Sequence, residues 1–351
     1  MTDSPEAPAS NSASPAVRRV VLSGIQPSGT LHLGNYFGAL RQHVARSQQA
    51  SQSGDAAFFF IVNYHALTSL RDAEALRRYT FDVALDYLAL GFDPEHAALF
   101  VQSDVPAVAE LAWIFNCLTP VADLENGLAY KDKVQNGLVA NAGLFTYPVL
   151  QAADILIYGG DVPTVVPVGA DQKQNLEIAR DVAGRFNTAF PGPDGAPTFV
   201  LPEALILPDV AVVPGVDGRK MSKSYGNTIG LFDDSVTLKK RVAAIVTDST
   251  PLEAPKDPDT DNVFALLRLF ATPEETAEIA AKYRAGGYGY GHAKARLREL
   301  IDEHFAAARE RRRVLEARPD FVRDVLADGA TKARRRADAV MATVRQRTGL
   351  G

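Results

Sequence analysis

Two lysines and two serines crowd into five consecutive residues of the chain, Lys220-Met221-Ser222-Lys223-Ser224. Glycines precede and follow this segment, so we expect it to form a mobile loop. A lysine ammonium on its flexible stem acts as a point charge toward phosphate, and a serine hydroxyl can donate a hydrogen bond to it. The segment therefore predicts a loop that grips a polyphosphate, with an ordinary basic surface loop as the alternative.

A second candidate for phosphate binding spans residues 24–36, GIQPSGTLHLGNY. Here an apolar run enters a Gly/Pro/Ser turn, and a helical pattern begins between His32 and Asn35. Such a geometry aims free backbone N–H groups and the positive end of a helix dipole at one point, which favours an anion. The glycine spacing matches neither a Walker A loop nor a dinucleotide fingerprint. The alternative is a tight turn with a helix cap.

Asp154 stands in an otherwise apolar helical pattern, residues 151–156 (QAADIL). A buried carboxylate is costly unless a donor pairs with it. An indole N–H is a donor without acceptor capacity and would satisfy this carboxylate, whereas a phenyl ring would leave it unpaired. The pattern therefore predicts either an indole-binding site or an aspartate that accepts from a neighbouring backbone group or serine.

The elements that must position these groups alternate along the first 235 residues. Four mostly apolar runs without regular alternation predict strands buried on both faces, as in a parallel sheet: 17–22, 56–62, 97–102 and 164–168. Helical spacing of apolar residues predicts helices at 72–90 and 171–190. Strands alternating with helices predict a doubly wound, Rossmann-like α/β domain, which binds ligands beyond the carboxyl ends of its strands.

The chain changes character after residue 235. Helical patterns follow at 238–246, 262–270, 273–283, 293–316 and 321–347. Basic residues gather there at 239–241, 309–313 and 332–336. Solvated helix faces and an RNA-facing surface are equally good interpretations of these clusters. We expect three parts: a disordered tail at 1–16, the α/β catalytic domain at 17–235 and a mostly helical domain at 236–351.

The composition of the 351 residues excludes several classes of protein. The single cysteine, Cys117, rules out an intramolecular disulfide and a cysteine zinc site, and it fits a reducing cytoplasm. No apolar run reaches the roughly 20 residues of a membrane span, and residues 1–16 lack the features of a secretory signal. With a net charge of −5, any nucleic-acid contact must come from local basic patches. We expect a cytoplasmic protein with no membrane or DNA partner.

Several side chains of reactive or ligating types stand outside any catalytic or metal-binding pattern in the sequence. The histidines at positions 43, 96, 292 and 304 have no metal-ligand spacing, so we expect them on the surface and expect no metal site. Trp113 and Phe115 fit a helix core. Cys117 fits a small core residue, because no basic neighbour would activate its thiol.

Together, the two phosphate-binding candidates resemble the HIGH and KMSKS signatures of class I aminoacyl-tRNA synthetases. Residues 24–29 and 33–36 resemble the bacterial-type tryptophanyl-tRNA synthetases within that class, with His32 as the first histidine of HIGH and Asn35 in place of the last. The resemblance continues through 144–158, 166–176 and 246–249 to 328–344, so it covers nearly everything after the tail. It implies a nucleotide-binding α/β domain with an insertion at about 94–143, and a helical domain that reads the tRNA anticodon.

The resemblance implies which residues bind ATP. The phosphates would be lined by Gln26, Pro27, Ser28, Gly34 and Asn35. The ribose would be held by Gly169, Ala170 and Asp171, and the adenine by the backbone of Val212 and Met221. The leaving pyrophosphate would be held by Lys220, Lys223 and Lys133, with Ser222, Ser224 and His32 beside them.

The resemblance also implies a tryptophan pocket. Asp154 would accept from the indole N–H, and Tyr147 and Gln172 would hold the α-ammonium group. The remaining pocket residues would be His65, Gln151, Ala129 and Leu22. Two of these depart from the family pattern, since Ala129 stands where glutamine is common and Gln151 where methionine is common. Because alanine removes volume and a polar group, we predict a roomier pocket that activates ring-substituted tryptophans.

The reaction implied by the resemblance has two steps. The tryptophan carboxylate attacks the α-phosphate of ATP to give tryptophanyl-adenylate and pyrophosphate, and the tryptophanyl group then moves to the 2′-OH of the terminal adenosine of tRNA(Trp). Mg²⁺ would arrive with ATP, without a protein ligand, and the enzyme would be a homodimer. A tyrosine-specific relative remains an alternative, as does a paralogue that mainly binds tryptophan, its adenylate or a partner protein.

Overall fold

The computed structural model describes residues 18–127, 130–131, 135, 140–168, 173–206 and 212–351. Its centre is a five-stranded parallel sheet with the spatial order β3-β2-β1-β4-β5. The strands are β1 (Val20–Ile25), β2 (Ala56–Ile61), β3 (Ala98–Val101), β4 (Thr164–Val168) and β5 (Glu203–Ile206). The α/β fold and all four predicted strands are confirmed, and β5 is a strand that the sequence analysis missed. The predicted tail at 1–16 lies outside the described residues.

Both faces of the sheet are buried at its centre, which explains why β2 and β3 are apolar throughout. In β2, Phe58 and Phe60 belong to the core on one face, and Phe59 and Ile61 belong to the core on the other. Successive strand residues point to opposite faces, so a strand buried on both sides has no polar alternation.

Helices cover the two faces separately. One face carries α5 (Ala107–Asn116), α8 (Ala142–Leu156) and α9 (Lys173–Ala189). The other carries α2 (Arg41–Ser53) and α4 (Ala73–Ala89). The shorter helices are α1 (Leu33–Asn35), the π-helix η1 (Tyr36–Leu40), α3 (Asn63–Ala66), η2 (Gln102–Asp104), α6 (Val121–Glu125), η4 (Pro193–Gly195) and η5 (Lys223–Tyr225).

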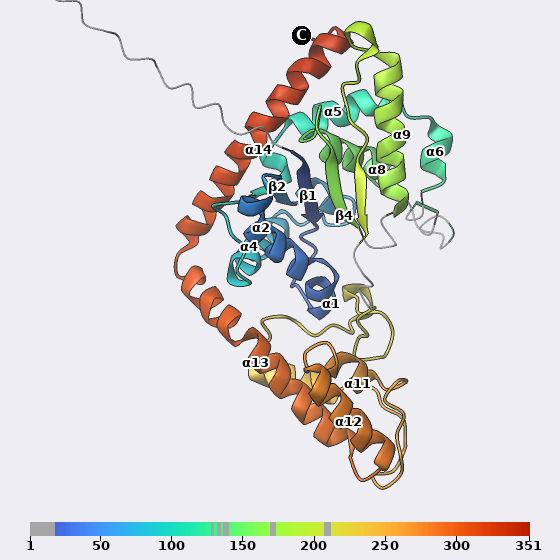
Figure 1. Ribbon diagram of the computed structural model, residues 1–351, viewed down its shortest axis with the longest axis vertical. Coiled ribbons are helices and arrows are strands. Elements are labelled where there is room, and N and C mark those ends of the chain that lie inside the picture. Colours follow the sequence, from blue (N-terminus) through green and yellow to red (C-terminus); the bar gives the residue numbers. More distant parts are fainter. Residues whose placement is uncertain (1–17, 128–129, 132–134, 136–139, 169–172, 207–211) are drawn as a thin grey trace, which may run out of the picture.

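The last five predicted helices are all present. They are α10 (Ser235–Ala243), α11 (Asn262–Leu267), α12 (Pro273–Ala285), α13 (Tyr290–Glu316) and α14 (Pro319–Thr348). Figure 1 shows α11 and α12 at one end of the molecule, with α13 leading back from them to the α/β part. The domain boundary at residue 235 stays a prediction.

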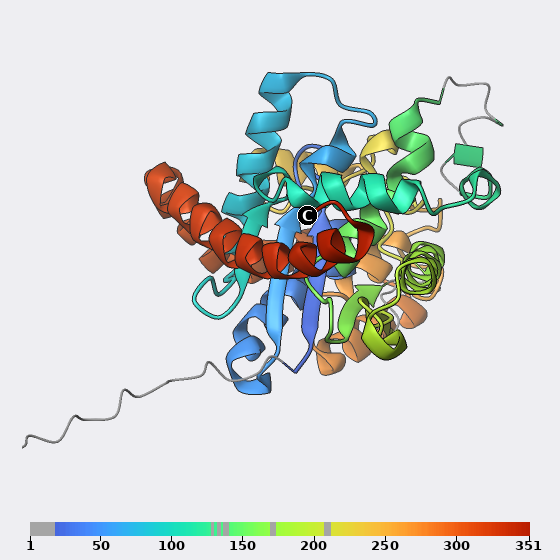
Figure 2. The same ribbon diagram turned by 90° about the horizontal axis from the view of Figure 1, so that it is seen from above.

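Helix α14 returns to the α/β part and lies beside the edge strand β3 (Figures 1 and 2). The approach is so close that a Cβ on Gly329 would lie 2.0 Å from the carbonyl oxygen of Leu99, so only glycine fits there. Met341 and Val344 of the same helix are buried in the core that also contains side chains of α8 and α9. The helix therefore packs against the edge strand of the sheet and shares its core.

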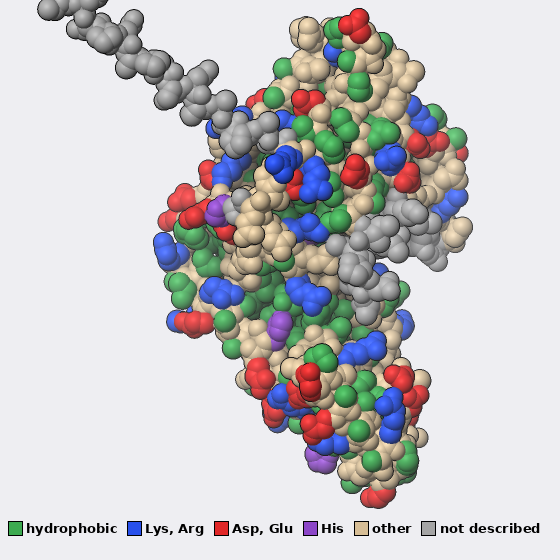
Figure 3. All heavy atoms as spheres, viewed as in Figure 1, with side chains coloured by type: hydrophobic (Ala, Val, Ile, Leu, Met, Phe, Trp, Pro, Cys, Tyr) green, Lys and Arg blue, Asp and Glu red, His purple; other side chains and the backbone are tan. Residues whose placement is uncertain are grey.

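The basic clusters on α13 and α14 hold the helices to the α/β part. Arg311 donates to the carbonyl of Ala89 at 2.7 Å, and Arg336 donates to the carbonyl of Tyr158 at 2.8 Å. Both arginines thus satisfy carbonyls at helix ends. On the face seen in Figure 3, acidic and basic side chains are interspersed. These clusters are used for intramolecular contacts, which neither interpretation of the sequence included.

Three of the isolated residues differ from expectation. His43 is only 2% exposed, because its Nδ1 pairs with the hydroxyl of Tyr87 at 2.7 Å in the core. Trp113 is 70% exposed and Cys117 is also exposed, so neither is a core residue. Phe115 is buried as expected, and the histidines at 96, 292 and 304 are exposed. No helix in the described part of the chain is long and apolar enough to cross a membrane.

Candidate active site

A cavity of about 1140 Å³ opens where the carboxyl ends of β1, β2 and β4 meet. The predicted site residues that line it are Leu22, Gln26, Ser28, His32, Gly34, Asn35, His65, Tyr147, Gln151, Asp154, Val212, Lys220, Met221, Ser222, Lys223 and Ser224. The carboxyl edge of a parallel sheet is where such folds bind ligands. The structure therefore brings the two ends of the predicted site into one cavity.

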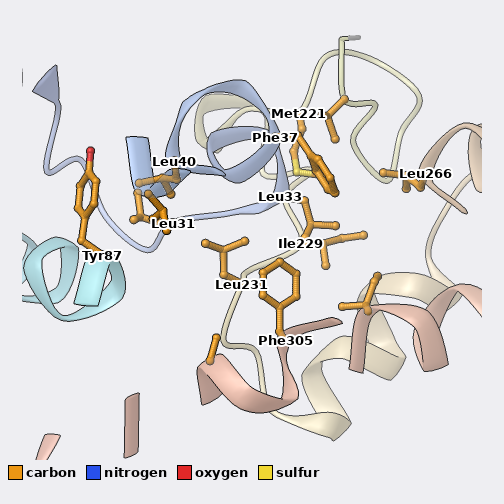
Figure 4. Packing of buried hydrophobic residues seen from close by; sticks show 14 of the residues in the cluster. Leu31, Leu33, Phe37, Leu40, Tyr87, Met221, Ile229, Leu231, Leu266 and Phe305 are labelled. Atoms are coloured by element: carbon orange, nitrogen blue, oxygen red, sulfur yellow. The ribbon is translucent and has the colours of Figure 1, made fainter. Parts of the chain in front are cut away.

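Apolar packing brings the two signature segments together beneath this cavity. Figure 4 shows Leu31 and Leu33 of the first segment beside Ile229 and Leu231, which follow the second segment. All four side chains are buried in one core that also holds Met221. Two backbone hydrogen bonds join these stretches of chain. The N–H of Leu33 donates to the carbonyl of Ile229 at 3.0 Å, and the N–H of Leu231 donates to the carbonyl of Leu31 at 3.1 Å.

The first segment forms a helix start whose backbone is already capped. The backbone N–H of His32 donates to Asn35 Oδ1 at 3.1 Å, so the amide group of Asn35 keeps its own hydrogens for a ligand. His32 Nδ1 is buried with no partner among the described residues. Burial, and then the charge of Lys223, lower the pKa of His32 to about 4. His32 is therefore neutral at pH 7 and can donate one hydrogen bond into the cavity.

The second segment is a small hairpin held from behind by Asn227. The N–H of Met221 donates to the carbonyl of Val213 at 2.9 Å. The buried Asn227 accepts from Ser222 N–H at 2.8 Å and donates to Asp217 at 2.7 Å. A side chain on Gly215 would overlap this amide, because its Cβ would lie 2.2 Å from Asn227 Nδ2. Asn227 was not among the predicted site residues, although it sets the loop's shape.

Lys223 connects the two signature segments. Its Nζ donates to Ser28 Oγ at 3.2 Å and to the carbonyl of Gly29 at 2.9 Å, across 195 and 194 positions in the sequence. Burial lowers the pKa of Lys223 to about 8, although the charge of Asp86 opposes this effect. No carboxylate in the described ranges forms an ion pair with this ammonium group, and the phosphates of a nucleotide would supply the missing negative charge.

At the other end of the cavity, Asp154 is paired with side chains from two neighbouring strand ends. It is 2% exposed and accepts from Gln102 Nε2 with both carboxylate oxygens, at 2.9 and 2.7 Å. His65 Nε2 lies 3.0 Å from Asp154 Oδ2, and the ring of Tyr147 stands edge-on to His65 at 6.2 Å between centroids. The partners are neither the backbone group nor the serine that the alternative interpretation required.

Some predicted residues do not line the described cavity. Pro27 is buried and is absent from its walls. Six others lie outside the described residues: Ala129, Lys133, Gly169, Ala170, Asp171 and Gln172. Gln102, like Asn227, was missed, because a single glutamine at the end of an apolar run carries no pattern. Within the described ranges, no three His, Cys, Asp or Glu side chains gather as a metal site would need.

Comparisons with known proteins agree with this geometry. The family described as tRNA synthetases class I (W and Y) matches residues 16–306. A tryptophan–tRNA ligase of Fusobacterium nucleatum is 53% identical over 313 residues, covering 89% of this chain and 92% of that protein. The tryptophan–tRNA ligase of Rhodopirellula baltica is 51% identical and covers 94% of this chain and 99% of its own.

A solved structure is similar over its whole length. The tryptophanyl-tRNA synthetase of Campylobacter jejuni, in complex with ADP and tryptophan, is 46% identical and has a TM-score of 0.84. The similarity covers 95% of this chain and 100% of that one.

Proposed function

Because the chain belongs to the class I tRNA synthetases for tryptophan and tyrosine, we propose that its large cavity binds ATP and tryptophan side by side. The protein is an enzyme that activates tryptophan with ATP and joins it to tRNA. The assignment of the cavity depends on one observation. Lys223 and Ser28, which are hydrogen-bonded to each other, line one end of it, and Asp154 lines the other.

The reaction needs little covalent chemistry from the protein. The tryptophan carboxylate attacks the α-phosphorus of ATP, the bond from that phosphorus to the bridging oxygen breaks, and pyrophosphate leaves. Holding the two reactants in line lowers the barrier by proximity, and donors aimed at the developing charge lower it further. Both effects require the two ends of the cavity to be filled at once.

At the ATP end, Lys220 and Lys223 stabilise the charge that moves onto pyrophosphate. Neutral His32 and the amide of Asn35 donate to phosphate oxygens, beside the hydroxyl of Ser28. Mg²⁺ carried by ATP would supply further positive charge, and the serine hydroxyls that line the cavity are oxygen groups compatible with the water shell that such an ion keeps. From the family pattern we also propose that Lys133 helps to hold the pyrophosphate, and that the ribose is held by Gly169, Ala170 and Asp171.

At the amino-acid end, Asp154 accepts from the indole N–H. Phenylalanine has no such donor and would leave the buried carboxylate with an unmet acceptor, so the site rejects it. Tyr147 and Gln172 hold the α-ammonium group. Because alanine at position 129 has less volume than the glutamine common in the family, we expect a roomier pocket that activates ring-substituted tryptophans better than a relative with the common residue does.

The proposed assembly includes tRNA(Trp) and a second copy of the chain, in the cytoplasm, where tRNA and ATP meet. The helical part after residue 235 reads the anticodon. The exposed Trp113 on α5 supports a dimer, because a large aromatic side chain is typical of the buried centre of an interface. A Trp113→Ala variant that sediments as a monomer supports this contact, whereas an unchanged dimer places the interface elsewhere.

ATP–pyrophosphate exchange with each of the twenty amino acids tests the proposed function. We expect exchange with tryptophan alone, followed by charging of tRNA(Trp). Exchange with tyrosine would mean that the ATP site is right and the Asp154 assignment is wrong. Absence of exchange would favour the paralogue that only binds ligands, and absence of tRNA charging alone would separate activation from transfer. Adding ring-substituted tryptophans measures the width of the pocket in the same assay.

A further inference from the structure

Behind the tryptophan end of the cavity, Gln102 lies at the end of β3 with no exposed surface. Its Nε2 donates to both oxygens of Asp154. Its Oε1 accepts from the backbone N–H of Tyr64 at 3.0 Å. Because a backbone N–H can only donate, the amide of Gln102 has one orientation that satisfies both ends, and its NH₂ group must face the carboxylate.

The backbone around Gln102 is fixed by a reciprocal pair of bonds. Asn63 Nδ2 donates to Ser103 Oγ at 2.8 Å, and the N–H of Ser103 donates to Asn63 Oδ1 at 3.1 Å. These bonds join the carboxyl ends of β2 and β3. Gln102 is therefore held on a rigid part of the sheet, while Asp154 reaches it from helix α8.

The donors of the described residues leave one acceptor position of Asp154 open. Within the part of the chain that the structure describes, Oδ2 accepts from Gln102 and from His65, whereas Oδ1 accepts from Gln102 alone. Each carboxylate oxygen has two acceptor positions, so one on Oδ1 remains. Asp154 and His65 line the cavity and Gln102 does not, so Gln102 can act on a ligand only through Asp154.

We propose that Gln102 is a positioning residue that fixes the plane of the Asp154 carboxylate and aims Oδ1 at the indole N–H. It thereby determines how strongly the enzyme prefers an indole to a ring of the same shape without that donor. This inference rests on the proposed role of Asp154 in binding tryptophan. A carboxylate held by one donor fewer rotates, and its open acceptor position no longer coincides with the indole nitrogen.

Two substitutions distinguish the hydrogen-bond donor of Gln102 from the volume of its side chain. Gln102→Met keeps the size of the side chain but has neither amide group. Gln102→Glu keeps an acceptor for Tyr64 N–H and places an oxygen, in place of the NH₂ donor, against Asp154. The probe substrates are tryptophan and its analogue in which sulfur replaces the indole NH, compared by kcat/KM in ATP–pyrophosphate exchange.

We expect Gln102→Met to lower kcat/KM for tryptophan by about 10- to 100-fold, the usual loss for a hydrogen bond to a charged group. The sulfur analogue makes no bond to Oδ1, so its kcat/KM stays within about 3-fold by the same argument. The preference for tryptophan therefore falls at least about 10-fold, and it falls further in Gln102→Glu, because two carboxylates repel each other.

Gln48→Met is the matched control, because it makes the same substitution at an exposed glutamine of α2 that donates to the carbonyl of Gly91, and it should leave the preference unchanged. Equal losses for both substrates in Gln102→Met would make Gln102 merely structural and overturn the proposal, as would an unchanged preference. If Gln102→Met does not fold by circular dichroism, the preference of Gln102→Glu decides in the same way. Asp154→Asn is measured in parallel: if it keeps the preference, the assignment of Asp154 itself is wrong, whatever Gln102 does.

Discussion

The two ends of the cavity are built in opposite ways. At the tryptophan end, Asp154 and Gln102 are buried and bonded to each other on a strand end and a helix. At the ATP end, the segment with Lys220 and Lys223 is a hairpin in which Lys220 is exposed and Lys223 is half-buried. Lys223 donates to a hydroxyl and a carbonyl of the opposite wall. The first end is organised before substrate arrives. At the second end, Lys220 and Lys223 form no ion pair with any carboxylate of the described residues, so the nucleotide itself completes it.

The largest expected effect is at the organised end. Asp154→Ala removes the acceptor for the indole and leaves the donors of Gln102 and His65 unpaired, so kcat/KM for tryptophan should fall by roughly 10⁴-fold. The KM for ATP should change little. Steady-state exchange measures both constants, and Asp161→Ala is the matched control, since the Asp161 side chain is 86% exposed. A similar rise in the KM for ATP would mean that the two ends are not independent.

Arg312 of α13 holds this helix against α4. Its Nε donates to the buried Asp86 of α4 at 2.8 Å. Arg312→Met leaves this carboxylate without its cation and should lower the free energy of unfolding by about 3–5 kcal/mol at pH 8. Arg313→Met, next to it, breaks only a surface pair with Glu310 and should cost less than about 1 kcal/mol. Urea denaturation measures both.

The stability lost in Arg312→Met should depend on pH in a defined direction. Burial raises the pKa of Asp86 to about 7, above the value of about 3.9 in an unfolded chain. The folded state then binds more protons than the unfolded state between these values, so the contribution of Asp86 to stability falls as pH rises through that window. Without Arg312 the pKa rises further, so the cost of Arg312→Met should shrink at pH 5.5. A cost that grows on acidification would contradict this account.

At the loop end itself, Lys223→Ala should lower the rate of adenylate formation by about 10²–10³-fold, the usual loss when one donor to the developing charge is removed. Tryptophan affinity should stay the same, because Asp154 and its partners are untouched. Single-turnover kinetics and equilibrium binding separate the two quantities. Equal losses in rate and tryptophan affinity would show that Lys223 supports the whole cavity and not the phosphates.

The smallest expected effect is the pH dependence of the KM for ATP. Because the pKa of Lys223 is lowered to about 8, the free enzyme loses this charge as pH rises, and binding of the phosphates weakens. The KM for ATP should rise about 10-fold from pH 7 to pH 9, as follows from the protonated fraction. Lys223→Arg stays charged throughout and should remove this rise. A rise that persists in Lys223→Arg would assign the titration to another group.

The sequence predicts the parts of this molecule whose cause is local. Strands buried on both faces leave an uninterrupted apolar run, and a carboxylate in an apolar helix such as Asp154 is conspicuous. Gln102 leaves no such trace, because its role depends on the register that places β3 beside β2 and on α8 above them. His43 is similar, since only the fold brings Tyr87 to its ring. Strand β5 was missed because it is four residues long and starts with glutamate.

The contact between α14 and β3 has a consequence for the cell. Arg334 of α14 is bonded to the carbonyl of Asp104, 230 positions earlier in the sequence. A ribosome makes the chain from its N-terminus, so the edge of the sheet emerges long before the helix that lies along it. An uncovered edge strand pairs readily with other chains. Substitutions at Gly329, where the helix touches the strand, should therefore reduce the yield of soluble protein during synthesis more than they reduce the turnover of the molecules that have folded.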